Sequence, residues 1–118
     1  MHTPILTQAH IDVWHEIEPR RGKENAVPVA EIVRRVPFAD RHVRALVKEL
    51  LEEHRKPIGS CKSGFYVIET AEESRECRHT WLSWGLSAVK RACALKNNAR
   101  LRRILGQLEL EIAEEEAP

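Results

Sequence analysis

The sequence predicts a mainly α-helical protein that carries one small β-hairpin, and three observations indicate this class. Apolar residues recur at helical spacing along most of the 118 residues. Residues 54–70, HRKPIGSCKSGFYVIET, instead hold two short strand-like runs around a turn that contains Ser and Gly. Charged residues make up 31% of the chain and aromatic residues only 5%, so a core must be built mainly from Leu, Ile, Val and Ala.

Three short elements are expected before residue 40. Thr7 is a suitable N-cap for a first helix, which ends at Pro19. The polar segment that follows closes on residues 26–27, which are expected to form one short extended strand. A second helix begins at Val29 and stops at Pro37, because the residue before a proline is disfavoured in a helix.

A third helix, capped by Asp40 and running to His54, gives the clearest two-sided pattern. At about 100° per residue, its apolar side holds Val43, Leu46, Val47, Leu50, Leu51 and His54. Its other side holds Arg41, Arg44, Lys48 and Arg55, with Glu49 and Glu52 on or near it. We expect the helix to pack through its aliphatic side and to present a row of cations to solvent.

The β-hairpin follows directly, because Pro57 ends the third helix. The runs PIGS and FYVIE form its strands, the segment CKSG forms its turn, and Lys62 lies at the tip. Thr70 and Glu73 then form the T-x-x-E capping box of a fourth helix. A break after Asn97-Asn98 separates it from a fifth helix at about residues 99–113, because the apolar positions change face there by roughly 140°.

Helix, short strand, helix, helix and hairpin is the element order of a winged helix-turn-helix domain. We expect this domain over residues 5–70, a two-helix C-terminal extension over residues 71–113, and a disordered acidic tail over residues 114–118. The third helix could then enter the major groove of double-stranded DNA while the hairpin reaches along the backbone. The expected DNA-binding residues are Arg41, His42, Arg44, Ala45, Lys48, Arg55, Lys56, Lys62 and Ser63. A row of cations also suits a helix that is merely solvated, so this prediction depends mainly on the element order.

The segment DRHVRALVKELLEEHRKPIGSCKSGFYVIETAEE resembles the recognition helix and wing of the small winged-helix proteins of bacteriophages and prophages. The resemblance covers residues 5–75 well and the fourth helix loosely. It implies DNA binding in transcriptional control or replication, with DNA-facing roles for Arg41, Arg44, Lys48 and Lys62.

Trp81 and Trp84 depart from the charged helix that usually follows such a wing, and they lie three residues apart on one face. Three roles are open: packing on the core, a homodimer interface, or base stacking. Base stacking is least favoured, because no cations are interleaved with the pair. A homodimer interface would comprise Trp81, Trp84, Ala88, Leu95, Leu101, Leu105 and Leu108. Two such heads on a two-fold axis would read an inverted repeat.

The net charge of +1 conceals charges that are sorted along the chain. Residues 78–108 hold seven Lys and Arg and no Asp or Glu, whereas residues 109–116 hold five Glu. We expect the basic block to add phosphate contacts or to meet an acidic partner.

The sequence predicts neither an enzyme nor a metalloprotein, so no cofactor is expected. It shows no Gly-rich phosphate loop, nucleophile motif or paired catalytic carboxylates. Three cysteines without CxxC spacing suit neither a disulfide framework nor a closed zinc site. Without a signal-peptide pattern or a long apolar run, a cytoplasmic protein with no membrane partner is expected. The main rival to DNA binding is a winged-helix protein-interaction module that assembles a larger complex.

Overall fold

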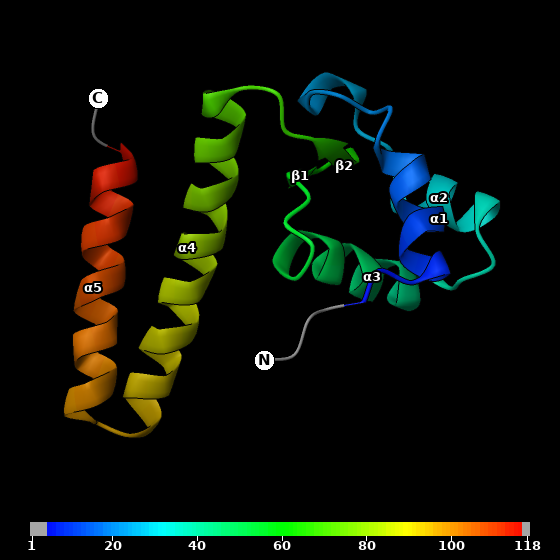
Figure 1. Cartoon of the computed structure of the whole chain (residues 1–118). Helices are drawn as coiled ribbons and strands as arrows, with labels where there is room; N and C mark the ends of the chain where they lie inside the picture. The colour runs from blue at the N-terminus through cyan, green and yellow to red at the C-terminus, as the bar shows by residue number, and fades with distance from the viewer. Residues whose placement is uncertain (1–4, 117–118) are drawn as a thin grey trace. The chain divides into compact units, whose positions relative to one another are not determined.

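A computed structural model describes residues 5–116 and shows a mainly helical chain with one two-stranded antiparallel hairpin (Figure 1). The helices are α1 (Gln8–Ile17), α2 (Val29–Arg35), α3 (Asp40–Glu52), α4 (Ala71–Leu95) and α5 (Ala99–Glu116), with a 3-10 turn η1 at Lys23–Asn25. The strands are β1 (Ile58–Cys61) and β2 (Gly64–Val67). The chain forms two compact units, a head that ends at Glu73 and a helical pair that begins at Ser74.

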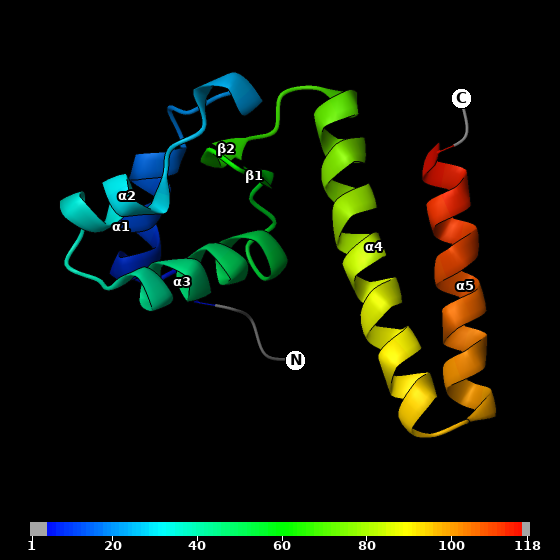
Figure 2. The ribbon, with the colours of Figure 1, turned by 180° about the vertical axis from the view of Figure 1, so that it is seen from behind.

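The core of the head lies among α1, α2, α3 and the β-hairpin (Figure 2). The predicted apolar side of α3 is buried through Val43, Leu46, Val47 and Leu50. The other elements contribute fully buried residues, namely Val13, Ile17, Val27, Ile32, Ile58 and Tyr66. The core therefore holds α3 by one side only.

The N-terminal turn of α1 has a side-chain cap, and that of α3 does not. Thr7 caps α1 as predicted: its hydroxyl oxygen accepts the His10 N–H, and His10 Nδ1 accepts the Thr7 N–H at 3.1 Å. Asp40 is not the N-cap of α3, because that position belongs to Ala39, whose side chain makes no capping hydrogen bond. The prediction for Asp40 was wrong, since Asp40 is the first helical residue and accepts a hydrogen bond from Arg44 at 2.7 Å.

The β-hairpin is held by more than its own two strands. β1 and β2 pair around a two-residue turn, Lys62-Ser63. Val27 forms an isolated antiparallel bridge with Phe65, in which the two N–H···O distances are 2.8 and 3.0 Å. The extended residues 26–27 therefore act as a minimal third strand, which anchors the hairpin to the segment before α2.

Gly64 follows the hairpin turn at a position that suits only glycine. Its φ is +126°, and a Cβ there would overlap the Val27 carbonyl that accepts the Phe65 N–H. We expect Gly64→Ala to lower the free energy of unfolding by about 1–3 kcal/mol, measured by urea unfolding. Gly106→Ala is the control, because Gly106 lies in α5 with open space around it, and should be neutral or stabilising by up to about 1 kcal/mol. Equal losses in both variants would contradict this account of the turn.

Glu73 ties the start of α4 to the loop before α2. The predicted capping box is present, because Thr70 Oγ1 accepts the Glu73 N–H at 3.1 Å and Glu73 Oε1 accepts the Thr70 N–H at 3.4 Å. The same carboxylate accepts the N–H groups of Lys23 at 2.8 Å and Glu69 at 2.9 Å. The hydrogen bond from Lys23, followed by that from Glu69, lowers the pKa of the Glu73 carboxyl below its ordinary value. One side chain thus joins the C-terminal end of the head to the η1 turn between α1 and α2.

Glu73→Gln should remove a stabilising contribution that depends on pH. Because the pKa of Glu73 is lower in the folded state, its contribution is complete above about pH 4.3, the ordinary value for Glu, and is lost as the pH falls through the folded-state value. We expect the variant to lose about 1 kcal/mol of unfolding free energy at neutral pH, since solvent screens the site. Urea unfolding at neutral and acidic pH should show this loss shrinking in acid. Glu72→Gln removes a charge from the same turn, and an equal, pH-independent loss there would contradict the role of Glu73.

The helices α4 and α5 run antiparallel as a pair and are fixed at both ends (Figure 1). At the loop between them, Asn98 Oδ1 accepts the Arg100 N–H at 2.8 Å, which confirms the predicted break before the fifth helix. At the opposite end, Arg78 binds both carboxylate oxygens of Glu115 at 3.1 Å. This hydrogen-bonded ion pair lowers the pKa of the Glu115 carboxyl and raises that of the Arg78 guanidinium. The acidic end of the chain is thereby part of the helical pair.

The end of α5 lies further along the chain than the sequence predicts. The helix continues to Glu116, so residues 114–116 of the expected acidic tail are helical. His79 Nε2 lies 2.9 Å from Glu116 Oε1, which adds a second contact at this end. Ala117 and Pro118, the rest of that tail, lie outside the described residues.

Candidate nucleic-acid interface

Five of the predicted DNA-binding residues lie together on the outward side of α3. All five are exposed: Arg41, His42, Arg44, Ala45 and Lys48. α1 and α2 both contact α3 on its buried side, so the core sets the position of this surface. Ala45 lies in the middle of the row, where its small side chain permits close approach by a ligand.

Contacts within and beside α3 divide its cations into paired and unpaired ones. Arg44 Nε lies 2.7 Å from Asp40 Oδ1 in an exposed ion pair between residues four apart. Arg41 and Lys48 make no ion pair within the part of the chain that the structure describes. The positive charge of the outward side is therefore concentrated at these two residues.

Two histidines and one glutamate lie at the contact between α1 and the end of α3. His10 is only 5% exposed, and its Nε2 lies 3.5 Å from Glu49 Oε1. The rings of His10 and His54 meet edge-on with centroids 5.0 Å apart, and neither Nε2 has a hydrogen-bond partner among residues 5–116. Because Nδ1 of His10 accepts the Thr7 N–H, the neutral ring carries its proton on Nε2, toward Glu49. Glu49 is half-buried here, so its charge is directed toward α1.

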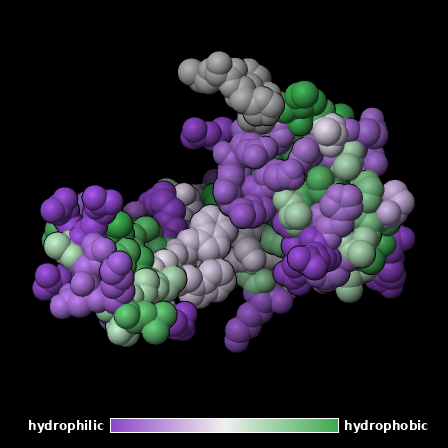
Figure 3. Space-filling view, turned by 90° about the horizontal axis from the view of Figure 1, so that it is seen from below, coloured by the Kyte–Doolittle hydropathy of each residue, from purple (hydrophilic) through white to green (hydrophobic). Residues whose placement is uncertain are grey.

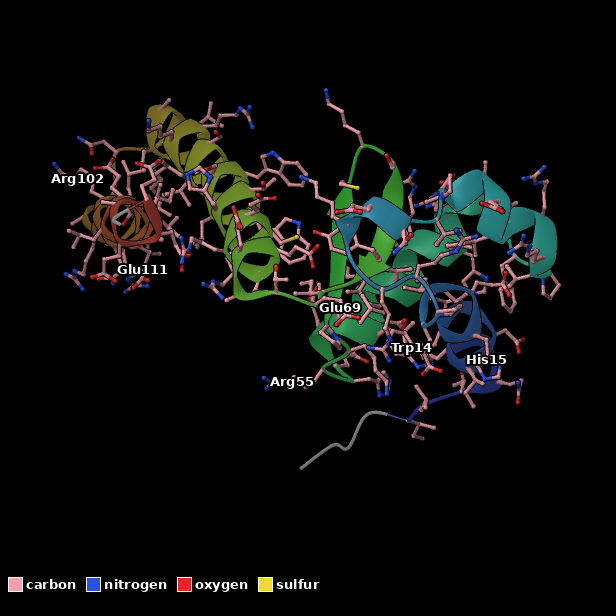
Figure 4. The ribbon with its side chains drawn as sticks, turned by 90° about the horizontal axis from the view of Figure 1, so that it is seen from above. Trp14, His15, Arg55, Glu69, Arg102 and Glu111 are labelled. Atoms are coloured by element: carbon pink, nitrogen blue, oxygen red, sulfur yellow. The ribbon has the colours of Figure 1, made fainter. Side chains whose placement is uncertain are left out.

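The four predicted residues beyond α3 have different surroundings. Lys62 and Ser63 form the exposed turn of the β-hairpin. Arg55 has a left-handed backbone with φ of 56° and projects into solvent (Figure 4). Lys56 instead places its Nζ 5.1 Å from the ring centroid of Trp14 in α1. Lys56 is therefore a brace between the hairpin connection and α1, a contact that sequence patterns did not indicate.

The predicted dimer residues fall into two groups in the helical pair. Trp84 and Leu95 are 65% and 90% exposed, and Trp81 and Ala88 are exposed beside them. These four residues lie within about 60° of arc on α4 and are called the Trp face below. The other three, Leu101, Leu105 and Leu108, are half-buried in α5. α4 also has a half-buried side, which lies about 140° from the Trp face and is formed by Leu82, Leu86, Val89 and Cys93.

Comparisons with known proteins do not indicate a function for this chain. A scan of protein-family models and searches of curated proteins and of solved structures find no match to this chain. Residues 5–116 contain no cluster of three or more His, Cys, Asp or Glu side chains that could hold a metal ion. Within the same residues, no helix has the length and apolar character needed to cross a membrane.

Proposed function

We propose that the head is a winged helix that binds double-stranded DNA, with α3 in the major groove and the β-hairpin as the wing. The observation that carries the proposal is the outward side of α3, where Arg41 and Lys48 are unpaired on a helix held by its opposite side. An α-helix with its side chains is about 10–12 Å across and suits a major groove about 12 Å wide. The resemblance to phage and prophage winged-helix proteins extends the proposal to transcriptional control or replication.

Each side chain has a distinct part in this proposal. Arg41, in the first turn of α3, would bond a guanine edge in two places, whereas Lys48, further along, would neutralise a phosphate. Arg44 would exchange Asp40 for DNA, which costs little because an exposed pair of this spacing is worth only about 0.3–0.5 kcal/mol. Lys62 and Ser63 at the wing tip would contact the backbone.

Fluorescence anisotropy of the full chain with a labelled duplex at several salt concentrations tests the proposal. Affinity should fall steeply as salt rises, with a logarithmic slope of about −0.9 for each phosphate neutralised. Lys62→Ala should reduce the slope by about one contact. Lys56→Ala is the matched control and should leave the slope almost unchanged, because Lys56 lies over Trp14. No binding to any duplex at low salt would overturn the proposal.

A second candidate is a protein-interaction module that has no DNA ligand. The exposed Trp84 favours it, because Trp is enriched at the energetic centres of interfaces. It predicts self-association or partner binding that persists when the duplex assay is negative. The same anisotropy titration therefore separates the two candidates.

A further inference from the structure

We infer that the outer face of α5 is a self-association surface, on which a second copy of this chain packs antiparallel so that the basic half of each face lies beside the acidic half of the other. The outer face comprises seven residues, namely Arg100, Arg103, Ile104, Gln107, Leu110, Glu111 and Glu114. The inference does not rest on DNA binding by the head. Its evidence is the exposure of this face, the order of its charges and their lack of partners.

The outer face lies on the exposed side of α5. At about 100° per residue, its seven residues fall within about 120° of arc centred on Gln107, and the half-buried leucines of α5 are centred about 130° away. Leu110 is 62% exposed and Ile104 is 46% exposed, so apolar surface lies between the charges. In the space-filling view, hydrophobic and hydrophilic side chains lie side by side on the surface of the helical pair (Figure 3).

The charges of the outer face change sign at its centre. Arg100 and Arg103 precede Gln107, and Glu111 and Glu114 follow it. All four charged residues are exposed, and none makes an ion pair within residues 5–116. Glu111 accepts only a neutral amide hydrogen bond, from Gln107 Nε2 at 3.2 Å. The face is therefore positive in its first half and negative in its second, and no charge in the described chain neutralises either half.

The order of these charges does not stabilise α5 itself. A helix favours carboxylates at its N-terminus and cations at its C-terminus, whereas the first turn of α5 contains no acidic residue and its last turn no basic one. Glu115 and Glu116 are accounted for by their contacts with Arg78 and His79 of α4. The four charges of the outer face make no such contact, so a partner of complementary charge accounts for their order.

A second copy turned end for end supplies that partner. Arg103 and Glu111 each lie four residues from Gln107, and Arg100 and Glu114 each lie seven residues from it. A two-fold axis at Gln107 therefore places each Arg level with a Glu of the other copy, and the two exposed apolar residues also lie level with each other. A parallel copy would place like charges together, and a wholly acidic or wholly basic partner would match only half of the face.

Sedimentation equilibrium of the full chain, over a range of protein and salt concentrations, tests the inference. The outer face has fewer residues than the roughly 20–30 per partner of a standard interface. We therefore expect a weak monomer–dimer equilibrium, with a dissociation constant on the order of 100 μM at low salt, that weakens further as salt rises. A chain that stays monomeric up to about 1 mM, or a dimer that salt leaves unchanged or tightens, would overturn the inference.

Arg103→Glu and Arg102→Glu form a matched pair of variants with the same change of charge. Arg102 lies about 140° from the centre of the outer face, and it projects from a different side of α5 than Glu111 does (Figure 4). Arg103→Glu should raise the dimer dissociation constant by about tenfold or more, whereas Arg102→Glu should change it little. Circular dichroism should show equal helix content in both, because a carboxylate near the N-terminus favours a helix. Equal weakening by the two variants would contradict the assigned face.

A charge exchange between two chains tests the same contact. Arg103→Glu and Glu111→Lys should each associate poorly alone but form a mixed dimer together, because the introduced carboxylate of one chain lies level with the introduced ammonium of the other. Glu109→Lys is the control partner, since Glu109 is exposed about 160° from the centre of the outer face, and it should not restore association with Arg103→Glu. Equal restoration by both Lys variants would mean that net charge alone drives association. A dimer that Trp84→Ala abolishes and Arg103→Glu leaves intact would assign self-association to the Trp face instead. Either result would contradict the inference.

Discussion

Replacing Arg41 and Lys48 together by Ala is expected to weaken duplex binding on the order of 100-fold at low salt. These are the cations of α3 that no acidic side chain within residues 5–116 neutralises, so their loss removes most of the positive charge of its outward side. The logarithmic salt slope should become shallower by the equivalent of about two phosphate contacts if both residues contact phosphate. It should change by the equivalent of about one contact if Arg41 bonds a base. Anisotropy titrations of the double variant and of each single variant measure both quantities.

The control for this double variant is Arg34→Ala. Arg34 is an exposed cation in the last turn of α2, so its removal changes the net charge without touching the outward side of α3. Its effect on affinity should be small. An effect of Arg34→Ala as large as that of Arg41→Ala would indicate general charge attraction and would contradict recognition by α3.

Leu50→Ala is expected to have the largest effect on the stability of the head. Leu50 is fully buried on the side of α3 that faces the core, and its removal leaves a cavity that costs about 2–5 kcal/mol. This loss is comparable with the whole stability of a domain of this size, roughly 5 kcal/mol. Urea unfolding followed by circular dichroism should show it, and duplex affinity should fall with the folded fraction.

Leu51→Ala provides the matched comparison at the next residue. Leu51 is only half-buried, so the same change of side chain should cost about 1 kcal/mol. Duplex binding should then remain close to that of the unmodified chain. Similar losses at both positions would contradict the burial pattern of α3.

The elements of the fold were predictable where local chemistry decides them. Thr7, the break before α5 and the Thr70–Glu73 capping box depend on residues close in sequence, and all three are present as predicted. Asp40 was misassigned because Asp suits both the N-cap and the first helical turn, where its carboxylate instead accepts the Arg44 side chain. Charges four residues apart also fit a helix, so the pattern could not choose between these roles.

The candidate site was predictable from helical periodicity but not in its contacts. The 100° rule placed Arg41, Arg44 and Lys48 on one exposed side of α3, and the structure agrees. The rule could not show that Lys56 turns toward Trp14, because that contact joins segments that only the folded head brings together. The same holds for the hydrogen bond from the Lys23 N–H to Glu73, which spans 50 residues. Short-range sequence patterns predict which residues share a face of a helix. The tertiary structure determines which charged residues form contacts with other parts of the chain.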